Sequence, residues 1–447
     1  MAYGLFVLFV PSVLFVPKKS KNMELTRRDF LRGSALALGA AAVPSALAAG
    51  PDPNVCRIGL IGMGVQCVKG HLNGLLHRRD VRVVAMCDPE SIRLNKAKEI
   101  AENYYKQHPE KNPGPIATFE DFRDLLARPD IDAVLIATQT HWHPTMSVLA
   151  ARAGKHIYCE KPMTLSIEEG HAIIEAVRAN NVVFQLGSQQ RSDDRFRLAC
   201  ELVRNGRIGK VKEIFINNVA GPSRECDLPA EPTPPTLNWD LWLGPAPWRP
   251  YNKVLCPLNN WANFPQWRQY RDYDGGGMTN WGAHHFDIAQ WALGMDESGP
   301  IMVVPPKESK YKRLTYVYAN GACVIHGGAK PGRAGLEIIG EKGRICVNRG
   351  YLYTEPEELM RTKWGAYDIR LYESRNHHDN FFDCIRKHKD CICTPEIGHH
   401  SSIVCHLGII CYRLDRTVRW DPVHEGFLND HEANQLMCKP HRYPWGV

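Results

Sequence analysis

The 447-residue sequence lacks a regular cysteine pattern, internal repeats and any basic run interleaved with aromatic residues. Its 15 cysteines are odd in number and have no spacing typical of a disulfide framework, so we expect buried thiols. Acidic and basic residues alternate although the net charge is +7, which argues against nucleic-acid binding. Hydrophobic residues make up 44% of the chain, enough for a full core, so global disorder is not expected.

Residues 1–50 read as an upstream segment and a targeting signal. Residues 26–31, Thr-Arg-Arg-Asp-Phe-Leu, are a twin-arginine signature, and an apolar run and a small-x-small cleavage site follow it. We therefore expect export through the twin-arginine machinery to the periplasm or cell envelope. The apolar run at 5–16 contains Pro11 and is short for a bilayer span. Met23 is accordingly the expected start, and an uncleaved anchor is the alternative.

Residues 51–180 alternate between strand and helix patterns, which predicts a doubly wound parallel sheet. A strand over 56–61 runs directly into Gly62-Met63-Gly64-Val65-Gln66-Cys67 and a helix over 68–76. Gly62 permits the tight turn, and Gly64 lets the backbone approach a pyrophosphate at the start of the helix. The third glycine of the motif is replaced by Cys67, whose small side chain still allows close packing. This pattern predicts a dinucleotide-binding domain.

The strand over 81–87 ends at Asp88, about twenty residues beyond the glycine turn, where an acid bonds the adenosine ribose hydroxyls. A carboxylate there repels a 2′-phosphate, so NAD is expected and NADP is less favoured, although Arg93 lies close in sequence. Helices are predicted over 91–107 and 119–126.

Polar residues also end the later strands. Thr138 and His143 follow the strand over 131–137, and Glu160 and Lys161 follow the strand over 156–159. Because parallel strands place their carboxyl ends at one edge of the sheet, where ligands bind in such folds, we expect these side chains beside the cofactor.

Residues 181–447 have an α+β pattern, with alternating strands over 211–219, 314–325 and 336–347 and helices in the final third. Turn residues at Asn320-Gly321 and at Glu341-Lys342-Gly343 suit an antiparallel sheet. A long Pro- and Trp-rich segment, 221–273, interrupts it. Its tryptophans either pack to hold an irregular loop or stack on sugar rings. A helix over 278–293 follows the glycine run Gly275-Gly276-Gly277 and carries Asn280 and His284.

From about residue 55 to the C-terminus, the chain resembles the Gfo/Idh/MocA family of NAD(P)-dependent oxidoreductases, in particular exported members. The resemblance is carried by the glycine turn, by Thr138 with His143, by Glu160-Lys161-Pro162 and by the segment 275–284. It implies a Rossmann domain and a second domain with a large, mostly antiparallel sheet. In the family, helices cover one face of that sheet and the other face often forms homo-oligomer contacts.

Hydride transfer requires a proton acceptor for the substrate hydroxyl and a group that stabilises alkoxide charge. We expect Lys161 and His284 to supply these, with Glu160 and His143 orienting the cofactor. In the family, the residue four positions before the histidine is commonly Asp, and here it is Asn280, which can hold a hydroxyl but cannot take a proton.

The sequence therefore predicts NAD-dependent hydride transfer to or from a sugar, polyol or glycoside. One alternative is an NAD-assisted glycoside hydrolase with a transient 3-keto intermediate. A second is a nucleotide- or sugar-binding protein without catalysis, which Asn280 motivates. Free NAD is scarce outside the cytoplasm, so an exported enzyme favours chemistry in which the hydride is taken and returned.

Several histidines lie close together in sequence, namely His377-His378, His399-His400 and His406. Their spacing lacks the carboxylate or cysteine pattern of a zinc site, so structural roles and no metal site are expected.

Overall fold

The computed structural model describes residues 52, 54–217, 220–258, 261–329 and 335–446. The twin-arginine signature, Met23 and the apolar run at 5–16 lie outside these residues. Among the described helices, none combines the length and the apolar composition that a bilayer crossing requires. The cysteines all lie in the described part of the chain as free thiols, and Cys438 alone is exposed, as expected.

The first domain is built on a parallel sheet of six strands in the order β3-β2-β1-β4-β5-β6. The strands are β1 (Cys56–Ile61), β2 (Val81–Cys87), β3 (Ala117–Phe119), β4 (Ala133–Ile136), β5 (His156–Cys159) and β6 (Phe184–Leu186). The helices between them are η1 (Gln66–Leu72), α2 (Asn73–His77), α3 (Ser91–Gln107), α4 (Phe122–Leu126), α5 (His143–Arg152) and α6 (Glu168–Ala179). This is the Rossmann order, and the strand order reverses between β1 and β4, beside the glycine turn. The sheet extends past residue 180 because β6 pairs with β5.

The second domain holds a sheet of nine strands in the order β13-β12-β11-β7-β10-β9-β8-β14-β15. Its strands are β7 (Val211–Ile216), β8 (Met302–Val304), β9 (Thr315–Val317), β10 (Cys323–His326), β11 (Leu336–Gly340), β12 (Arg344–Asn348), β13 (Tyr351–Glu355), β14 (Val418–Asp421) and β15 (Gly426–Phe427). The pair β7–β10 is parallel and the other pairs are antiparallel, which confirms a mostly antiparallel sheet.

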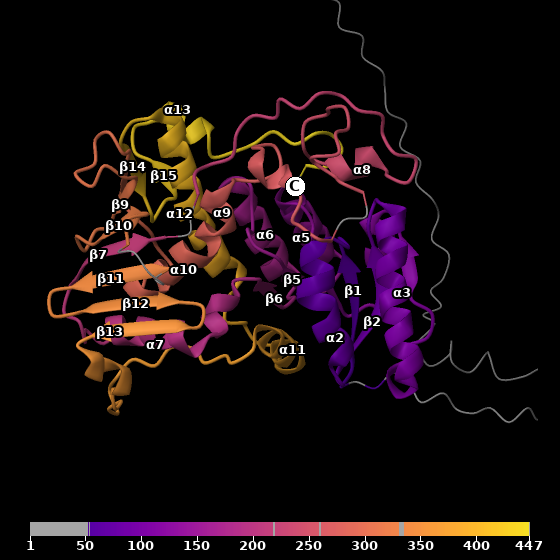
Figure 1. The fold of residues 1–447 in the computed structure, drawn as a ribbon, viewed down its shortest axis with the longest axis horizontal. Helices are drawn as coiled ribbons and strands as arrows, with labels where there is room; N and C mark the ends of the chain where they lie inside the picture. Colours follow the sequence, from indigo (N-terminus) through magenta and orange to yellow (C-terminus); the bar gives the residue numbers. More distant parts are fainter. Residues whose placement is uncertain (1–51, 53, 218–219, 259–260, 330–334, 447) are drawn as a thin grey trace, which may run out of the picture. The chain divides into compact units, whose positions relative to one another are not determined.

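Helices α7 (Asp194–Arg204), α10 (Gly282–Leu293) and α12 (Pro395–Leu414) contact the strands of this sheet. In Figure 1 the strands β11, β12 and β13 lie beside one another, with α7 and α10 next to them. Helix α11 (His377–Lys387) lies next to the first domain instead. The apolar residues of α10 and α12 are almost all buried, which anchors both helices in the core.

Some predicted elements differ in detail. The helix expected over 68–76 begins with a π-helical stretch, η1. The segment 119–126 ends a strand at Phe119 before α4 begins. The helix expected over 278–293 is two helices, α9 (Gly277–Asn280) and α10, with Trp281 between them. The segment 314–325 forms a hairpin of β9 and β10, as its turn residues Asn320 and Gly321 predict.

The Pro- and Trp-rich segment forms an aromatic cluster of its own. Trp239 and Trp242 in helix α8 (Trp239–Leu243) stack with ring centroids 4.6 Å apart, and Trp267 is also buried. This packing supports the structural interpretation for these three side chains. The same segment reaches the glycine turn, where the Trp261 indole donates to the carbonyl of Met63 at 3.0 Å.

Candidate functional site

The glycine turn has the geometry that a dinucleotide requires. Gly62 has φ +90°, and a Cβ there would lie 2.8 Å from the carbonyl oxygen of Ala137 and from Cγ2 of Thr138. A Cβ on Gly64 would meet nothing within 4 Å, so the backbone is open on that side. The N–H of Met63 donates a hydrogen bond to Asp88 Oδ2 at 2.7 Å, and this bond stabilises the turn.

Asp88 lies at the end of β2, where the sequence placed it, and is 4% exposed. Burial raises its pKa, and the charge of Arg93, 3.3 Å away, opposes that rise. Arg93 also donates to the carbonyl of Pro257 at 3.0 Å, so its guanidinium joins Asp88 to the aromatic segment. The Asp88 carboxylate would repel the 2′-phosphate of NADP, which agrees with the expected preference for NAD.

A cavity of about 70 Å³ lies against this turn, lined by Gly62, Gly64, Asp88, Thr138 and Arg268 together with Phe264 and Trp267. The donor set fits a dinucleotide: open glycine backbone, a ribose-binding acid and a cation. The aromatic segment forms the wall opposite the sheet edge.

His143 adds an unused acceptor at the same edge. Its Nδ1 lies 2.7 Å from the carbonyl of Pro162, so Nδ1 carries the proton and donates. The Nε2 atom is buried and has no partner among the described residues. Burial lowers the pKa of His143, which keeps this ring neutral and its Nε2 atom a hydrogen-bond acceptor.

Glu160 follows β5 and is held by two side chains of η1. Gln66 Nε2 lies 3.2 Å and His71 Nε2 3.0 Å from Glu160 Oε1. Residues five apart share a face in a π-helix, which explains why these two converge. Burial opposes ionisation of Glu160, but the His71 hydrogen bond and the charge of Lys161 bring its pKa down to about 2. No sequence motif pointed to His71.

Lys161 connects the two domains. Its Nζ donates to the backbone carbonyl of Asn280 at 3.2 Å. Burial of the ammonium group lowers the pKa of Lys161 to about 8, Glu160 opposes the shift, and Arg268 adds to it. Burial and then the charge of Lys161 lower the pKa of His284 well below 6.5, so this imidazole is neutral. The structure therefore places the lysine that follows β5 against Asn280, four residues before the later histidine, and close enough for the lysine charge to affect that histidine.

Sequence reasoning missed Asp274, the residue directly before the glycine run. Its Oδ1 accepts from Asn280 Nδ2 at 2.7 Å and from the N–H of Gly276 at 2.8 Å, and its Oδ2 accepts from Thr140 Oγ1 at 2.6 Å. Burial raises the pKa of Asp274 to about 6, against the Thr140 hydrogen bond and the charge of Arg268. A carboxylate thus lies beside Asn280, although position 280 itself has none.

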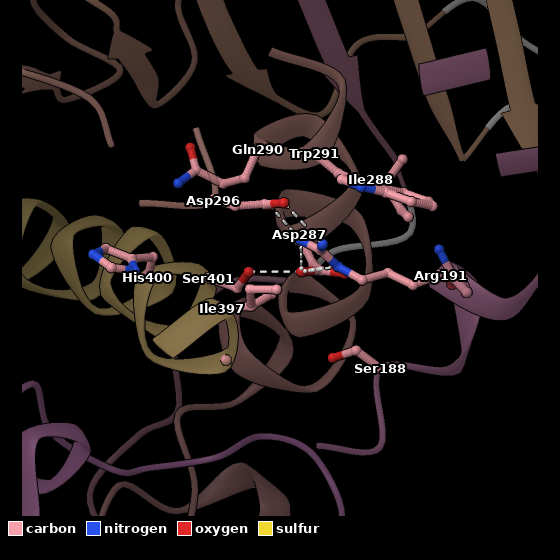
Figure 2. Close-up of polar contacts among 12 residues, drawn as sticks. Ser188, Arg191, Asp287, Ile288, Gln290, Trp291, Asp296, Ile397, His400 and Ser401 are labelled. Atoms are coloured by element: carbon pink, nitrogen blue, oxygen red, sulfur yellow. Dashed lines mark hydrogen bonds and ion pairs between the residues drawn. The ribbon is translucent and has the colours of Figure 1, made fainter. Parts of the chain in front are cut away.

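A buried ionic network around Asp287, shown in Figure 2, anchors helix α10, which also carries His284. Asp287 accepts from Arg191 Nε at 2.9 Å and Nη2 at 2.8 Å, and from Ser401 Oγ at 2.7 Å. Arg191 also pairs with Asp296 at 2.7 Å. Asp287 is fully committed, so it is not a partner of His284, whose Nδ1 is buried without a partner among the described residues.

A six-stranded parallel sheet in the Rossmann order, with a glycine turn after β1 and an acid at the end of β2, defines a dinucleotide-binding domain. The chain belongs to the Gfo/Idh/MocA oxidoreductase family. The family's "NAD-binding Rossmann fold" model matches residues 56–188, and its "C-terminal alpha/beta domain" model matches residues 201–447.

Characterised and uncharacterised relatives agree with this assignment. The chain is 25% identical over 359 residues to the uncharacterized oxidoreductase YrbE of Bacillus subtilis, covering 76% of this chain and 89% of that protein. It is 28% identical over 295 residues to scyllo-inositol 2-dehydrogenase (NAD(+)) of B. subtilis, covering 62% and 73%. It is 27% identical over 228 residues to a glycosyl hydrolase family 109 protein of Shewanella pealeana, covering 46% of this chain and about half, 49%, of that protein.

Solved structures share the fold. The aldose-aldose oxidoreductase of Caulobacter crescentus, complexed with glycerol, aligns with a TM-score of 0.55 at 17% identity, covering 82% of this chain and 99% of that one. The WlbA dehydrogenase of Bordetella pertussis, in complex with NADH and UDP-GlcNAcA, aligns with a TM-score of 0.57 at 18% identity, covering 83% and 99%.

Proposed function

We propose that the protein transfers a hydride between NAD and a hydroxyl-bearing carbon of a sugar, polyol or glycoside. The observation that carries this proposal is Lys161, which ends β5 on the nucleotide edge and bonds to Asn280 of the second domain at 3.2 Å. The inositol, aldose and nucleotide-sugar names of its relatives support the substrate class.

Bound NAD would supply the hydride acceptor for oxidation and the hydride donor for reduction. Gly62, Met63, Gly64, Asp88 and Thr138 would hold it, with His143 and Glu160 beside it. Lys161 in its neutral form accepts the hydroxyl proton during oxidation and, as an ammonium, returns it during reduction. Its pKa of about 8 suits both directions near neutral pH.

His284 acts as a neutral hydrogen-bonding group for the substrate oxygen, since its pKa is held well below 6.5 by burial and by Lys161. Asn280 and Asp274 position Lys161 through the backbone carbonyl of Asn280. The presence of Asp274 weakens the case for a non-catalytic binding protein, which rested on Asn280 alone.

The test is direct. Native mass spectrometry and calorimetry measure bound NAD or NADP, and NADH formation is followed with a panel of sugars, polyols and glycosides. We expect NAD binding and a substrate whose oxidation Lys161→Ala abolishes. A protein that binds neither dinucleotide, or a Lys161→Ala variant with full activity, contradicts the proposal.

A glycoside hydrolase that uses NAD transiently is the second candidate, favoured by similarity to the family 109 protein. Assays with aryl glycosides, with and without added NAD, distinguish the hydrolase from the dehydrogenase. Hydrolysis that requires NAD and gives no net NADH favours the hydrolase, whereas net NADH favours the dehydrogenase.

We also propose export through the twin-arginine route to the periplasm, on the strength of residues 26–31. A cofactor bound before export would have to be regenerated within each turnover, which favours sugar–sugar oxidoreduction. Cell fractionation of the wild type and of a variant with Arg27 and Arg28 changed to Lys tests this. Retention of the variant in the cytoplasm is expected, and equal export of both contradicts it.

We further propose a homo-oligomer that uses the outward face of the second sheet. Phe215, Glu337, Cys346 and Tyr353 form one cross-strand row, and Tyr353 is 38% exposed. Light scattering should show an oligomer that Tyr353→Glu weakens, and a monomeric wild type contradicts the proposal.

A further inference from the structure

Three histidines converge on one carboxylate far from the nucleotide edge. His171 comes from α6, His399 and His400 come from the first turns of α12, and Glu425 lies in the turn between β14 and β15. The Nε2 atoms of His171 and His399 lie 3.1 and 2.9 Å from Glu425 Oε2, and His400 Nε2 lies 3.2 Å from Oε1. We propose that His171, His399 and Glu425 form a divalent metal site that suits Zn²⁺.

The ligand atoms already have the spacing of a metal site. The ligand atoms of His171, His399 and Glu425 lie within 4.8 Å of one another. Ligands at about 2.0–2.2 Å from a tetrahedral Zn²⁺ are separated by about 3.4 Å. Only small side-chain shifts are therefore needed to place an ion between them. Two imidazoles and one carboxylate are a donor set that Zn²⁺ prefers, with a further position open to water.

The hydrogen-bonding pattern leaves room for a cation. His400 Nδ1 lies 2.9 Å from the carbonyl of Glu396, which can only accept, so Nδ1 carries a proton. That bond orients the ring so that Nε2 faces Glu425. The Nδ1 of His399 is buried and has no partner among the described residues. An ion here would take the place of the Nε2 protons that His171 and His399 direct at Glu425 Oε2.

Gly170 leaves the space that the His399 ring occupies. A Cβ on Gly170 would overlap the His399 ring, so glycine in α6 is what allows this imidazole to lie against the helix. The His399 side chain is 2% exposed and Glu425 is 14% exposed, whereas His171 is 48% exposed. The site thus has one buried ligand, His399, one partly buried ligand, Glu425, and one ligand at the surface, His171, where an ion can enter.

The site joins α6 of the first domain to α12 and the β14–β15 turn of the second. Ser401, next to His400 on α12, donates to Asp287 of α10, as Figure 2 shows. Metal binding would therefore stabilise the helix that supports α10. This role is independent of the proposed hydride transfer.

The test uses the full chain without a polyhistidine tag, stripped with a chelator and titrated with Zn²⁺ against a chromophoric chelator. We expect one Zn²⁺ per chain with submicromolar affinity and a rise in Tm. His171→Ala, at a half-exposed position that should not affect folding, is expected to weaken binding at least tenfold. Co²⁺ should give the visible spectrum of a four-coordinate site.

His424→Ala is the matched control. His424 adjoins Glu425 in sequence, is 82% exposed and bonds to Asp421 Oδ2 at 2.7 Å, so its loss should leave Zn²⁺ affinity unchanged. Absence of binding at 10-fold excess over micromolar protein overturns the proposal, as does His171→Ala binding with wild-type affinity.

Discussion

Asn280 Nδ2 donates to Asp274 Oδ1 at 2.7 Å, and the carbonyl of the same Asn280 accepts from Lys161 Nζ at 3.2 Å. The residue that replaces the family's usual aspartate is therefore held by another aspartate. A carboxylate therefore lies beside position 280, although that position itself has none. Asp274 also raises the pKa of Lys161 through its charge, although less than burial lowers it.

A charge exchange between these positions tests the relationship. Asp274→Asn removes the charge while preserving the shape, and we expect kcat to fall about ten- to a hundredfold, since hydrogen bonds to charged groups contribute about 1.5–3 kcal/mol. The pH midpoint of the rate should also move down, because Lys161 loses a nearby negative charge. Adding Asn280→Asp to this variant should restore most of the loss. A double variant no better than Asp274→Asn would show that Asp274 has only a packing role.

Lys161 predicts the pH dependence of oxidation. Its pKa is lowered to about 8, and the reactive form is the neutral amine, so kcat/KM for oxidation should rise with pH and level off above about 8. Lys161→Arg keeps the charge but cannot deprotonate, and we expect a loss of about 10²–10⁴-fold. Steady-state kinetics from pH 6 to 10 measure both. A flat profile for the wild type would rule out Lys161 as the titrating group.

The hydrogen bond between His71 and Glu160 should make the stability of the folded protein depend on pH in the acid range. Glu160 has its pKa lowered to about 2, so its stabilising contribution is present above the unfolded value near 4.5 and is lost as pH falls towards 2. His71→Ala removes the main hydrogen bond that lowers this pKa and should cost about 1–3 kcal/mol at pH 7. Urea unfolding at pH 7 and pH 3 should show a smaller pH dependence for the variant.

His77→Ala is the control for this experiment, because the exposed His77 side chain has one hydrogen-bond partner within the described residues, the carbonyl of Asn73 at 2.8 Å. Equal stability losses for His71→Ala and His77→Ala would contradict the role of His71.

Breaking the buried Arg191–Asp287 ion pair should lower the free energy of unfolding by a large amount. Both side chains are almost fully buried, at 1% and 0% exposure. Arg191→Met leaves Asp287 buried without its cation and should cost about 3–5 kcal/mol. Arg195→Met, at an exposed pair with Asp193, should cost less than about 1 kcal/mol. Denaturant unfolding of both variants measures the difference, and similar values for the two would contradict the prediction.

Several features were predictable from the sequence because their causes are local. The glycine turn at Gly62 and Gly64, the acid at Asp88 and the strand end at Lys161 follow from hydrophobic periodicity and turn chemistry over a few residues. The limits of α3 were predicted correctly because a clear amphipathic pattern follows the Asp88 turn. The break at Trp281 and the π-helical stretch η1 were not predicted, because local propensity does not distinguish either feature from a continuous α-helix.

The sequence by itself determined the Rossmann fold, the family and the cofactor edge, because each depends on residues that are neighbours in the chain. The tertiary structure decided which distant side chains meet: His71 with Glu160, Arg191 with Asp287, and His171 with His399 and Glu425. These pairings depend on how helices and sheets pack, and packing is a property of the whole core. For the same reason only the folded chain shows that Asp274 supplies the charge that position 280 lacks.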